Sequence, residues 1–488
     1  MVRVEQWLSA GEPVPSFVNG RWSAAAAGKL AVHAPATGET IGVVGYGGVE
    51  EALAAADAAA AAFTGWAEAP ARFRADILSR AGELLSARAE PLGRVLAMET
   101  GKRLPEAIAE VRFACEFLRW YAEEARRPQG EILSVEDPAR RHLTLSRPVG
   151  VAVCLTPWNF PVSIPARKLA AALAAGCSVV CRASEKAPLA VLELFAVLEE
   201  AGLPPGVANA IHGPAESQVN ALLHHRAVRV VSFTGSTAVG RHIMELASHR
   251  VVRCALELGG NAPFLVFSDA DLDAAVQGLL IAKFRNNGQS CVAANRVYVE
   301  DSVLGEFIEL LAAAVAKLCV GDPLADPTPD VGPLIDRERV EAVTSLVSEA
   351  VADGARWIGP SATLPPGGHY TRPGFLQDVP PGCQLATTEV FGPVAAVFPF
   401  HDEEEALALA NASEMGLAAY IYTRDLARAW RAIEKVEAGI VGLNHPVPPV
   451  AFAPMGGVKQ SGMGREGGRR GLEEYLDTRY VAIGLDRQ

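Results

Sequence analysis

The segment 149–184, VGVAVCLTPWNFPVSIPARKLAAALAAGCSVVCRAS, decides the fold class of this chain. It holds a short apolar run rich in β-branched residues, then a run rich in Ala and Leu, then a second short apolar run. This order predicts a strand, a helix and a parallel strand. The alternation continues through LAVLELFAVLEEAG, ANAIHG and VRVVSFTG, so we expect a parallel sheet covered by helices.

A second α/β series follows residue 291, with the strand-like runs NRVYVE, VAAVFPF, AAYIYT and GIVGLN. Two α/β lobes with a cleft between them are therefore predicted. Before the first lobe, residues 49–63 and 71–101 show helical composition and periodicity, and the second helix should end at Gly101. Residues 125–147 are typical of a polar hairpin, and residues 472–485 of a strand.

Composition limits the class of protein. The chain has 488 residues, half of them apolar, which is enough for two or three globular domains. No apolar run reaches the roughly 18 residues of a membrane helix, and the start does not resemble a signal peptide, so we expect a cytoplasmic protein. The net charge of −12 argues against nucleic acid or an anionic membrane as a partner.

Eight cysteines are scattered along the chain, and disulfides are not expected in a cytosolic protein of this size. Cys177 and Cys181 have a CxxxC spacing, but no second pair lies nearby to complete a zinc site, so no metal is predicted. Most cysteines stand in apolar runs. Cys291 instead follows NNGQS, which leaves two interpretations open, a buried thiol and a nucleophile.

Polar side chains follow the predicted strands at their carboxyl ends, where ligands of α/β sheets collect. Asn159 comes shortly after a strand that ends at Thr156, and it is either an oxyanion donor or a turn residue. Arg182, Ser184 and Glu185 follow the next strand. Glu185 could accept from the ribose hydroxyls of NAD, or these residues form a solvated charge cluster.

Two further strand ends carry residues that could bind a ligand or take part in catalysis. Gly235, Ser236 and Gly240 lie in a turn that opens a helix, which is either a pyrophosphate site or an ordinary βα turn. Glu257 lies in the apolar run ALELGG. Burial there should raise its pKa and make it a general base, unless it forms a salt bridge.

Together the motifs resemble those of the aldehyde dehydrogenase superfamily. The matching stretches cover nearly the whole chain in the family's order: FVNGRW, PATGE, METGK, TPWNFP, FTGSTAVG, LELGGNAP, GQSC, EVFGPV and PMGGVKQSGMGRE. The resemblance implies an α/β, aldehyde dehydrogenase-like fold with a Rossmann-type NAD-binding domain (1–124 and 148–257) and an α/β catalytic domain (258–458). It also implies a small β oligomerisation element (125–147 and 459–488) and a homodimer or homotetramer.

The resemblance also assigns roles. Cys291 is similar to the nucleophile that attacks the aldehyde carbonyl, and Asn159 with the Cys291 N–H to the oxyanion hole. Glu257 is similar to the base that hydrolyses the thioester, and Lys168 to the family's lysine near Asn159 and the cofactor. Residues at cofactor-binding positions are Thr156, Trp158, Arg182, Ser184, Glu185, Gly235, Ser236, Leu258, Glu389 and Phe391. Glu185 favours NAD, whereas Arg182, where the family usually has Lys, leaves NADP open.

Two arginines distinguish the substrate site. Arg167 and Arg285 stand where members for small neutral aldehydes carry bulky residues, and we expect both, with Phe160 and Met455, to line the substrate tunnel. Their anion is either a protein carboxylate or a substrate carboxylate. KFRN-GQ-C and ELGGNAPF resemble the succinate-semialdehyde dehydrogenase branch, so oxidation of succinate semialdehyde to succinate is predicted.

Some substitutions keep alternatives open. Pro449, Val450 and Met455 depart from the branch and make the tunnel more apolar, so another ω-oxo acid or an apolar aldehyde is an alternative substrate. A CoA-acylating dehydrogenase is a second alternative, against which Glu257 argues. A non-catalytic structural or binding relative would be expected to lack Cys291, Glu257 or Asn159.

Overall fold

The segment 149–184 folds as a βαβ unit in the computed structural model, which describes residues 2–23, 27–127, 130–361, 363–380, 382–447 and 449–485. Strand β7 (Val151–Thr156), helix α6 (Ser163–Ala175) and strand β8 (Ser178–Ala183) follow one another, and the strands pair in parallel. The helix begins at Ser163, two residues before Pro165. A proline fits there because the first helical N–H groups have no partner within the helix.

The first lobe is built on an eight-stranded sheet in the order β2-β1-β9-β8-β7-β10-β11-β21. Its other strands are β1 (Ser16–Val18), β2 (Arg21–Ser23), β9 (Ala208–Ile211), β10 (Val228–Thr234), β11 (Arg253–Glu257) and β21 (Gly462–Met463). Strands β9, β8, β7, β10 and β11 are parallel. Their carboxyl ends therefore share one edge of the sheet, which brings Thr156, Thr234 and Glu257 to that edge.

Helices cover both faces of this sheet because β7 is apolar on both sides. Val151, Val153 and Leu155 pack into one buried cluster, and Ala152 and Cys154 into another. The helices of this lobe are α1 (Arg3–Ala10), α2 (Val49–Glu68), α3 (Ala71–Ala87), α4 (Ala89–Thr100), α5 (Leu104–Glu124), α7 (Leu192–Glu200), α8 (Ala215–His224) and α9 (Thr237–Ser248). A two-stranded sheet, β3 (Gly28–His33) with β4 (Thr40–Tyr46), lies near the N-terminus.

Residues 71–101 were predicted as one helix. This was wrong in one respect, because the segment forms two helices that are separated at Arg88. Its predicted end is confirmed, since Gly101 adopts a left-handed conformation at φ 76° and terminates α4. The Ala-rich helix predicted at 49–63 extends to Glu68.

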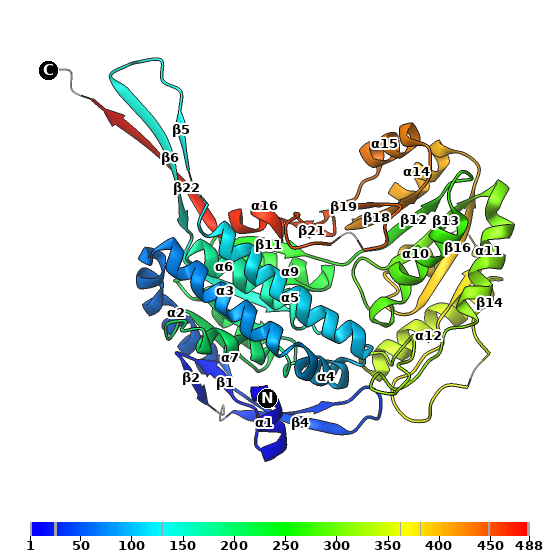
Figure 1. The fold of residues 1–488 in the computed structure, drawn as a ribbon, viewed down its shortest axis with the longest axis horizontal. Helices are drawn as coiled ribbons and strands as arrows, with labels where there is room; N and C mark the ends of the chain where they lie inside the picture. Colours follow the sequence, from blue (N-terminus) through cyan, green and yellow to red (C-terminus); the bar gives the residue numbers. More distant parts are fainter. Residues whose placement is uncertain are drawn as a thin grey trace.

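The second lobe contains a seven-stranded sheet in the order β14-β15-β16-β13-β12-β18-β19 (Figure 1). Its strands are β12 (Ala262–Val266), β13 (Ala294–Glu300), β14 (Arg356–Ile358), β15 (Gly374–Gln377), β16 (Val394–Phe400), β18 (Ala418–Tyr422) and β19 (Ile440–Leu443). Its helices are α10 (Leu272–Phe284), α11 (Asp301–Val315), α12 (Arg337–Ala352), α13 (Gln384–Thr387), α14 (Glu403–Asn411) and α15 (Leu426–Lys435). The short strands β17 (Met415–Gly416) and β20 (Val458–Lys459) pair separately.

A three-stranded arm projects from the first lobe, on the side away from the second lobe (Figure 1). It consists of β5 (Gly130–Leu133), β6 (Arg140–Pro148) and β22 (Leu476–Gly484), so the predicted hairpin is confirmed. The predicted C-terminal strand begins later than expected, because α16 (Gly468–Glu473) precedes it. Residues 459–475 do not join the arm, since β21 pairs with β11 and α16 packs on α6.

Across the described ranges, no helix combines the length and the apolar character needed to cross a lipid bilayer.

Candidate active site

Cys291 lies where two cavities meet. One cavity, of about 260 Å³, also contains Arg285 and is called the Arg285 cavity. The other, of about 210 Å³, contains Glu389 at the carboxyl edge of the first sheet and is called the Glu389 cavity. Cys291 therefore contributes to the walls of both cavities.

The loop before Cys291 is rich in side-chain amides, and these form hydrogen bonds with the main chain. Asn286, Asn287 and Gly288 have φ values of 54°, 57° and 74°, a conformation that Asn and Gly adopt most readily. The Asn287 side chain donates to Gly101 O at 2.9 Å and accepts from Gly332 N at 2.7 Å. These bonds fix the loop between both lobes.

Burial controls the protonation of Cys291. Removal from water raises the pKa of the thiol to about 12, and the nearby charges of Glu389 and Glu257 act in the same direction. The resting side chain is thus a neutral thiol, and it needs a base to become a nucleophile.

Asn159 lines the Glu389 cavity together with Cys291. It is 4% exposed, and its Nδ2 donates to the main-chain oxygen of Gln289 at 3.2 Å. The predicted amide donor and the predicted nucleophile therefore share one cavity.

Glu257 ends β11 and is buried, although it lines neither of the two cavities. Among the described residues, neither of its carboxylate oxygens has a hydrogen-bond partner. Burial and the neighbouring charge of Glu466 raise its pKa well above the ordinary value, which is the direction predicted from the sequence. A carboxylate whose pKa is raised is a stronger proton acceptor than an exposed one.

Glu466 was missed by the sequence analysis, although it stands in the quoted stretch PMGGVKQSGMGRE. Its Oε2 lies 2.5 Å from Arg167 Nε, and its Oε1 forms an ion pair with Lys168. Lys168 also donates to Ser232 Oγ at 2.9 Å. Burial alone raises the pKa of Glu466, but the two cations lower it below its ordinary value. Lys168 therefore belongs to a buried ion cluster and lines neither cavity.

The Arg285 cavity collects all four residues predicted for the substrate tunnel, namely Arg167, Arg285, Phe160 and Met455. The Arg285 guanidinium lies 5.7 Å from the centre of the Phe160 ring. Within the described part of the chain, no carboxylate forms an ion pair with Arg285, whereas Arg167 is paired with Glu466. Other lining residues are Lys102, Glu106, Ala109, Glu110, Phe113, Ser163, Ile164, Asn286, Ser290, Val292, Val447 and Pro449.

The Glu389 cavity contains most of the predicted cofactor positions. These are Trp158, Gly235, Ser236, Leu258, Glu389 and Phe391. Ser236 caps α9 by accepting from Val239 N at 3.4 Å. Glu389 accepts from Gly260 N at 3.3 Å, and burial raises its pKa to about 7. Arg339 also lines this cavity and was not predicted.

A third cavity, of about 380 Å³, lies between the ends of β7 and β10 and helices α8 and α9. Thr156 and Arg182 line it. Arg182 Nη2 donates to Glu185 Oε2 at 2.8 Å, and this cation lowers the pKa of Glu185 although burial opposes it. Ser184 is buried beside them and accepts from Lys186 N.

The sheet edge fits a dinucleotide. It offers the N-terminus of α9 for a pyrophosphate, and the ionised Glu185 and the free oxygen of Glu389 for ribose hydroxyls. A dinucleotide site beside a half-buried thiol is the arrangement of a cofactor-linked oxidoreductase that works through cysteine. The chain belongs to the aldehyde dehydrogenase family, because the model described as "Aldehyde dehydrogenase family" matches residues 22–481.

Curated relatives support the same conclusion. The chain is 43% identical to a glutarate-semialdehyde dehydrogenase of Pseudomonas aeruginosa, over 96% of this chain and 97% of that protein. It is 43% identical to an NADP(+) succinate-semialdehyde dehydrogenase of Escherichia coli, over 96% of this chain and 98% of that protein. It is also 43% identical to a 3-sulfolactaldehyde dehydrogenase of Pseudomonas putida, over 97% of each chain.

Solved structures agree on the fold. A succinate-semialdehyde dehydrogenase from Burkholderia pseudomallei is 42% identical, with a TM-score of 0.95 over 98% of this chain and 99% of that chain. A betaine aldehyde dehydrogenase from Staphylococcus aureus, in complex with NAD+, is 33% identical, with a TM-score of 0.94 over 99% of this chain and 96% of that chain. The predicted fold class and the prediction of an NAD(P)-dependent aldehyde dehydrogenase are confirmed.

Proposed function

We propose that this enzyme oxidises an aldehyde with a distal carboxylate, foremost succinate semialdehyde, to the acid. The proposal is carried by the place of Cys291 on the walls of two cavities, one with predicted cofactor positions and one with Arg285. A substrate whose carboxylate contacts Arg285 would present its aldehyde to the thiol.

The residues of the site supply the covalent chemistry. A water molecule in the cavity takes the thiol proton, and the Cys291 sulfur then forms a bond to the carbonyl carbon. The Asn159 amide and the Cys291 N–H hold the oxygen that becomes negative. The bound dinucleotide supplies the hydride acceptor, and loss of the hydride leaves a thioester. Glu257, with its raised pKa, then takes a proton from the water that cleaves the sulfur–carbon bond.

Arg285 is the principal contact for the substrate carboxylate. The sequence left open whether the arginines face a protein carboxylate or a substrate carboxylate. We propose a protein carboxylate for Arg167 and a substrate carboxylate for Arg285. Arg167 faces Glu466, which offsets its charge, whereas Arg285 forms no ion pair among the described residues and its guanidinium lies over the Phe160 ring. The three relatives are named for anionic aldehydes, which supports a cation in this role.

The first test is substitution of Arg285. A charged hydrogen bond is worth roughly 1.5–3 kcal/mol, so Arg285→Ala should lower kcat/KM for succinate semialdehyde about ten- to a hundredfold. Butanal, which lacks the carboxylate, should lose much less. Initial rates of reduced nicotinamide formation measure both, with glutarate semialdehyde as a third substrate.

The matched control is Arg72→Ala, which removes the same charge from an exposed position of α3. It should leave the kcat/KM values of all three aldehydes unchanged. Equal losses for succinate semialdehyde and butanal in Arg285→Ala would contradict a contact with the carboxylate.

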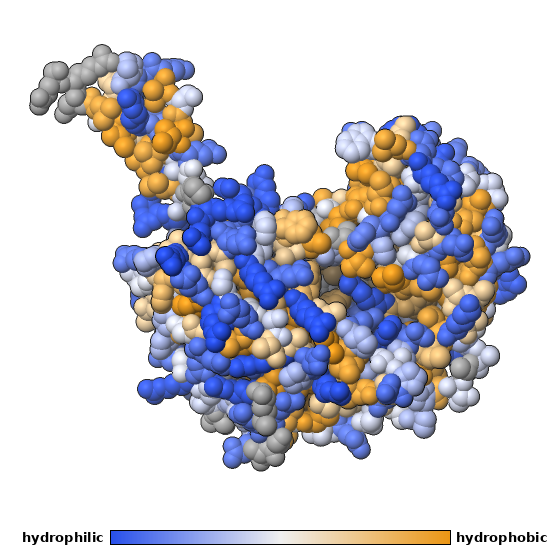
Figure 2. All heavy atoms as spheres, viewed as in Figure 1, coloured by the Kyte–Doolittle hydropathy of each residue, from blue (hydrophilic) through white to orange (hydrophobic). Residues whose placement is uncertain are grey.

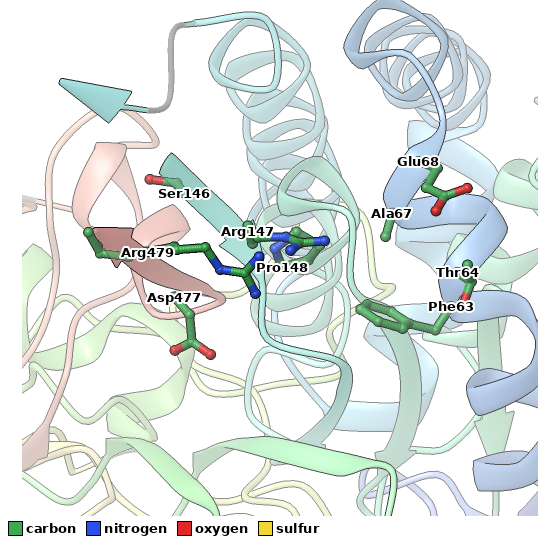
Figure 3. Close-up of a pocket in the computed structure, with 10 residues that line it drawn as sticks. Phe63, Thr64, Ala67, Glu68, Ser146, Arg147, Pro148, Asp477 and Arg479 are labelled. Atoms are coloured by element: carbon green, nitrogen blue, oxygen red, sulfur yellow. The ribbon is translucent and has the colours of Figure 1, made fainter. Parts of the chain in front are cut away.

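We also propose that the arm contacts a second copy of this chain in a homodimer or homotetramer. Apolar side chains are exposed on it, as Figure 2 shows in orange, among them Ile132 at 87%. Its outer strands β5 and β22 also have open hydrogen-bonding edges, which favour pairing with another chain. At its base, Arg147 and Arg479 point into a groove of about 650 Å³ that faces the end of α2 (Figure 3).

For the cofactor we propose a preference for NAD over NADP, because Glu185 remains ionised and would repel a 2′-phosphate. The cytoplasmic location stays a prediction.

A further inference from the structure

We propose that Lys102 is a positioning residue for Asn159, which it holds through the main-chain carbonyl. The inference rests on the proposed role of Asn159 as oxyanion donor. Lys102 lies between α4 and α5, in the stretch METGK, and it is 1% exposed.

The Lys102 ammonium contacts a main-chain carbonyl, a carboxylate and an aromatic ring. Its Nζ donates to Asn159 O at 2.8 Å and forms an ion pair with Glu110 of α5. It also lies 4.4 Å from the centre of the Phe160 ring, which is the residue after Asn159. An ammonium has three donors and no acceptor, so these partners satisfy it in a place where an unpaired charge would be costly.

Glu110 connects the lysine to the far end of the same turn. Its Oε1 accepts from Val162 N at 2.9 Å and from Ser163 N at 3.1 Å, at the start of α6. The Lys102–Glu110 pair therefore holds both ends of the segment 159–163.

Asn286 connects this turn to the cysteine loop. Its Nδ2 donates to Asn159 O at 3.0 Å and to Gln289 O at 2.9 Å. The Asn159 side chain donates to the same Gln289 oxygen, two residues before Cys291. With Lys102 removed, the Asn159 carbonyl keeps only one of its two donors, and the peptide can rotate. A shift of about 1 Å in a catalytic group can cost a hundredfold in rate.

The variant Lys102→Met/Glu110→Gln tests the inference without leaving an uncompensated buried carboxylate. We expect the rate of the first-turnover burst of reduced nicotinamide with succinate semialdehyde to fall about ten- to a hundredfold. The KM for NAD and the rate of Cys291 alkylation by iodoacetamide should stay within about threefold, because neither needs an oxyanion donor. If this variant does not fold, Lys102→Gln takes its place, since it removes the ammonium and shortens the side chain.

A matched control removes a similar pair elsewhere. Glu193 is fully buried, pairs with Arg88, and accepts from Arg3 N and Val4 N at the start of α1, as Glu110 does at the start of α6. Arg88→Met/Glu193→Gln should lower the melting temperature and leave the burst rate unchanged.

A double-mutant cycle with Asn159→Ala decides the mechanism. If Lys102 acts through Asn159, adding the Lys102/Glu110 changes to Asn159→Ala should cost less than about threefold more. The inference on Lys102 would be overturned if the burst rate fell by the same factor with and without Asn159→Ala, or if it did not fall in Lys102→Met/Glu110→Gln. Either result would leave the proposed function unaffected. An unchanged burst in Asn159→Ala would instead refute the proposed oxyanion donor, and the role of Lys102 with it.

Discussion

The reactivity of Cys291 depends on its burial. Because burial raises the pKa of the thiol to about 12, the thiolate fraction should rise about tenfold per pH unit between pH 7 and pH 9. We predict that alkylation of the ligand-free enzyme by iodoacetamide follows this slope, measured by the mass of the modified protein. A plateau of the rate near pH 7 would show a thiol activated before substrate binds.

Glu185 should determine the choice of cofactor. Its pKa is lowered by Arg182, so it is ionised at neutral pH, and a phosphate nearby would meet a like charge. We predict that Glu185→Ser lowers the KM for NADP about tenfold or more, which corresponds to about 1.4 kcal/mol, and raises the KM for NAD. Steady-state kinetics with both cofactors measure the ratio, and an unchanged ratio would contradict the assignment.

Individual residues were predictable where a local pattern carried the signal. Cys291 stood out through its polar neighbours, and Asn159 through its place after a strand. Glu466 and Lys102 were not predicted as site residues, because they meet Arg167 and Asn159 only through the topology. Both stand in quoted motifs, yet no local spacing indicates which side chains they reach.

At the scale of elements, the alternation of short apolar runs with Ala-rich runs was sufficient for the parallel strands. The breaks were less predictable. The periodicity of α3 continues into α4 across Arg88, although Pro91 in the first turn of α4 could have indicated the break, since a proline fits the start of a helix and not its interior. The start of α6 at Ser163 depends on Glu110 of another helix, which accepts from the N–H of Ser163.

The end of α4 should make stability depend on pH. Glu99 is fully buried and accepts from Leu189 N and Ala190 N before α7, and burial raises its pKa from 4.5 to about 7. Because the folded pKa is the higher one, its contribution is complete below pH 4.5 and is lost as the pH rises through 7. The loss is about 3 kcal/mol, from roughly 1.4 kcal/mol per pKa unit.

Glu99→Gln removes this titration. We therefore predict that the melting temperature of Glu99→Gln, relative to that of the unsubstituted protein, rises as the pH is increased from 5 to 8. A difference between the two proteins that stays constant over this range would contradict a raised pKa at Glu99.

At the scale of the whole molecule, the arm should decide the oligomeric state. We predict that Ile132→Asp, at the 87% exposed position of β5, dissociates the oligomer into monomers, measured by light scattering after size exclusion. Val251→Asp changes a residue that is 91% exposed on the first lobe and should leave the mass unchanged. A monomeric unsubstituted protein, or an unaffected Ile132→Asp, would contradict the proposed contact.

The two-lobed organisation was predictable because each lobe has its own strand series. The position of the C-terminal segment was less predictable. Residues 459–475 were assigned to the oligomerisation element, yet β21 and α16 lie against the first lobe, and α16 packs on α6 beside Arg167 and Lys168. This return of the chain brings Glu466 into the site, and it depends on contacts between segments far apart in sequence.

The most direct test of a covalent mechanism at Cys291 is the intact mass of Glu257→Gln after incubation with succinate semialdehyde and NAD. Without its base the enzyme should release about one reduced nicotinamide per subunit and retain one succinyl group as a thioester, located at Cys291 by peptide mapping. Reduced nicotinamide formed with no adduct, or with an adduct on another residue, would contradict the mechanism.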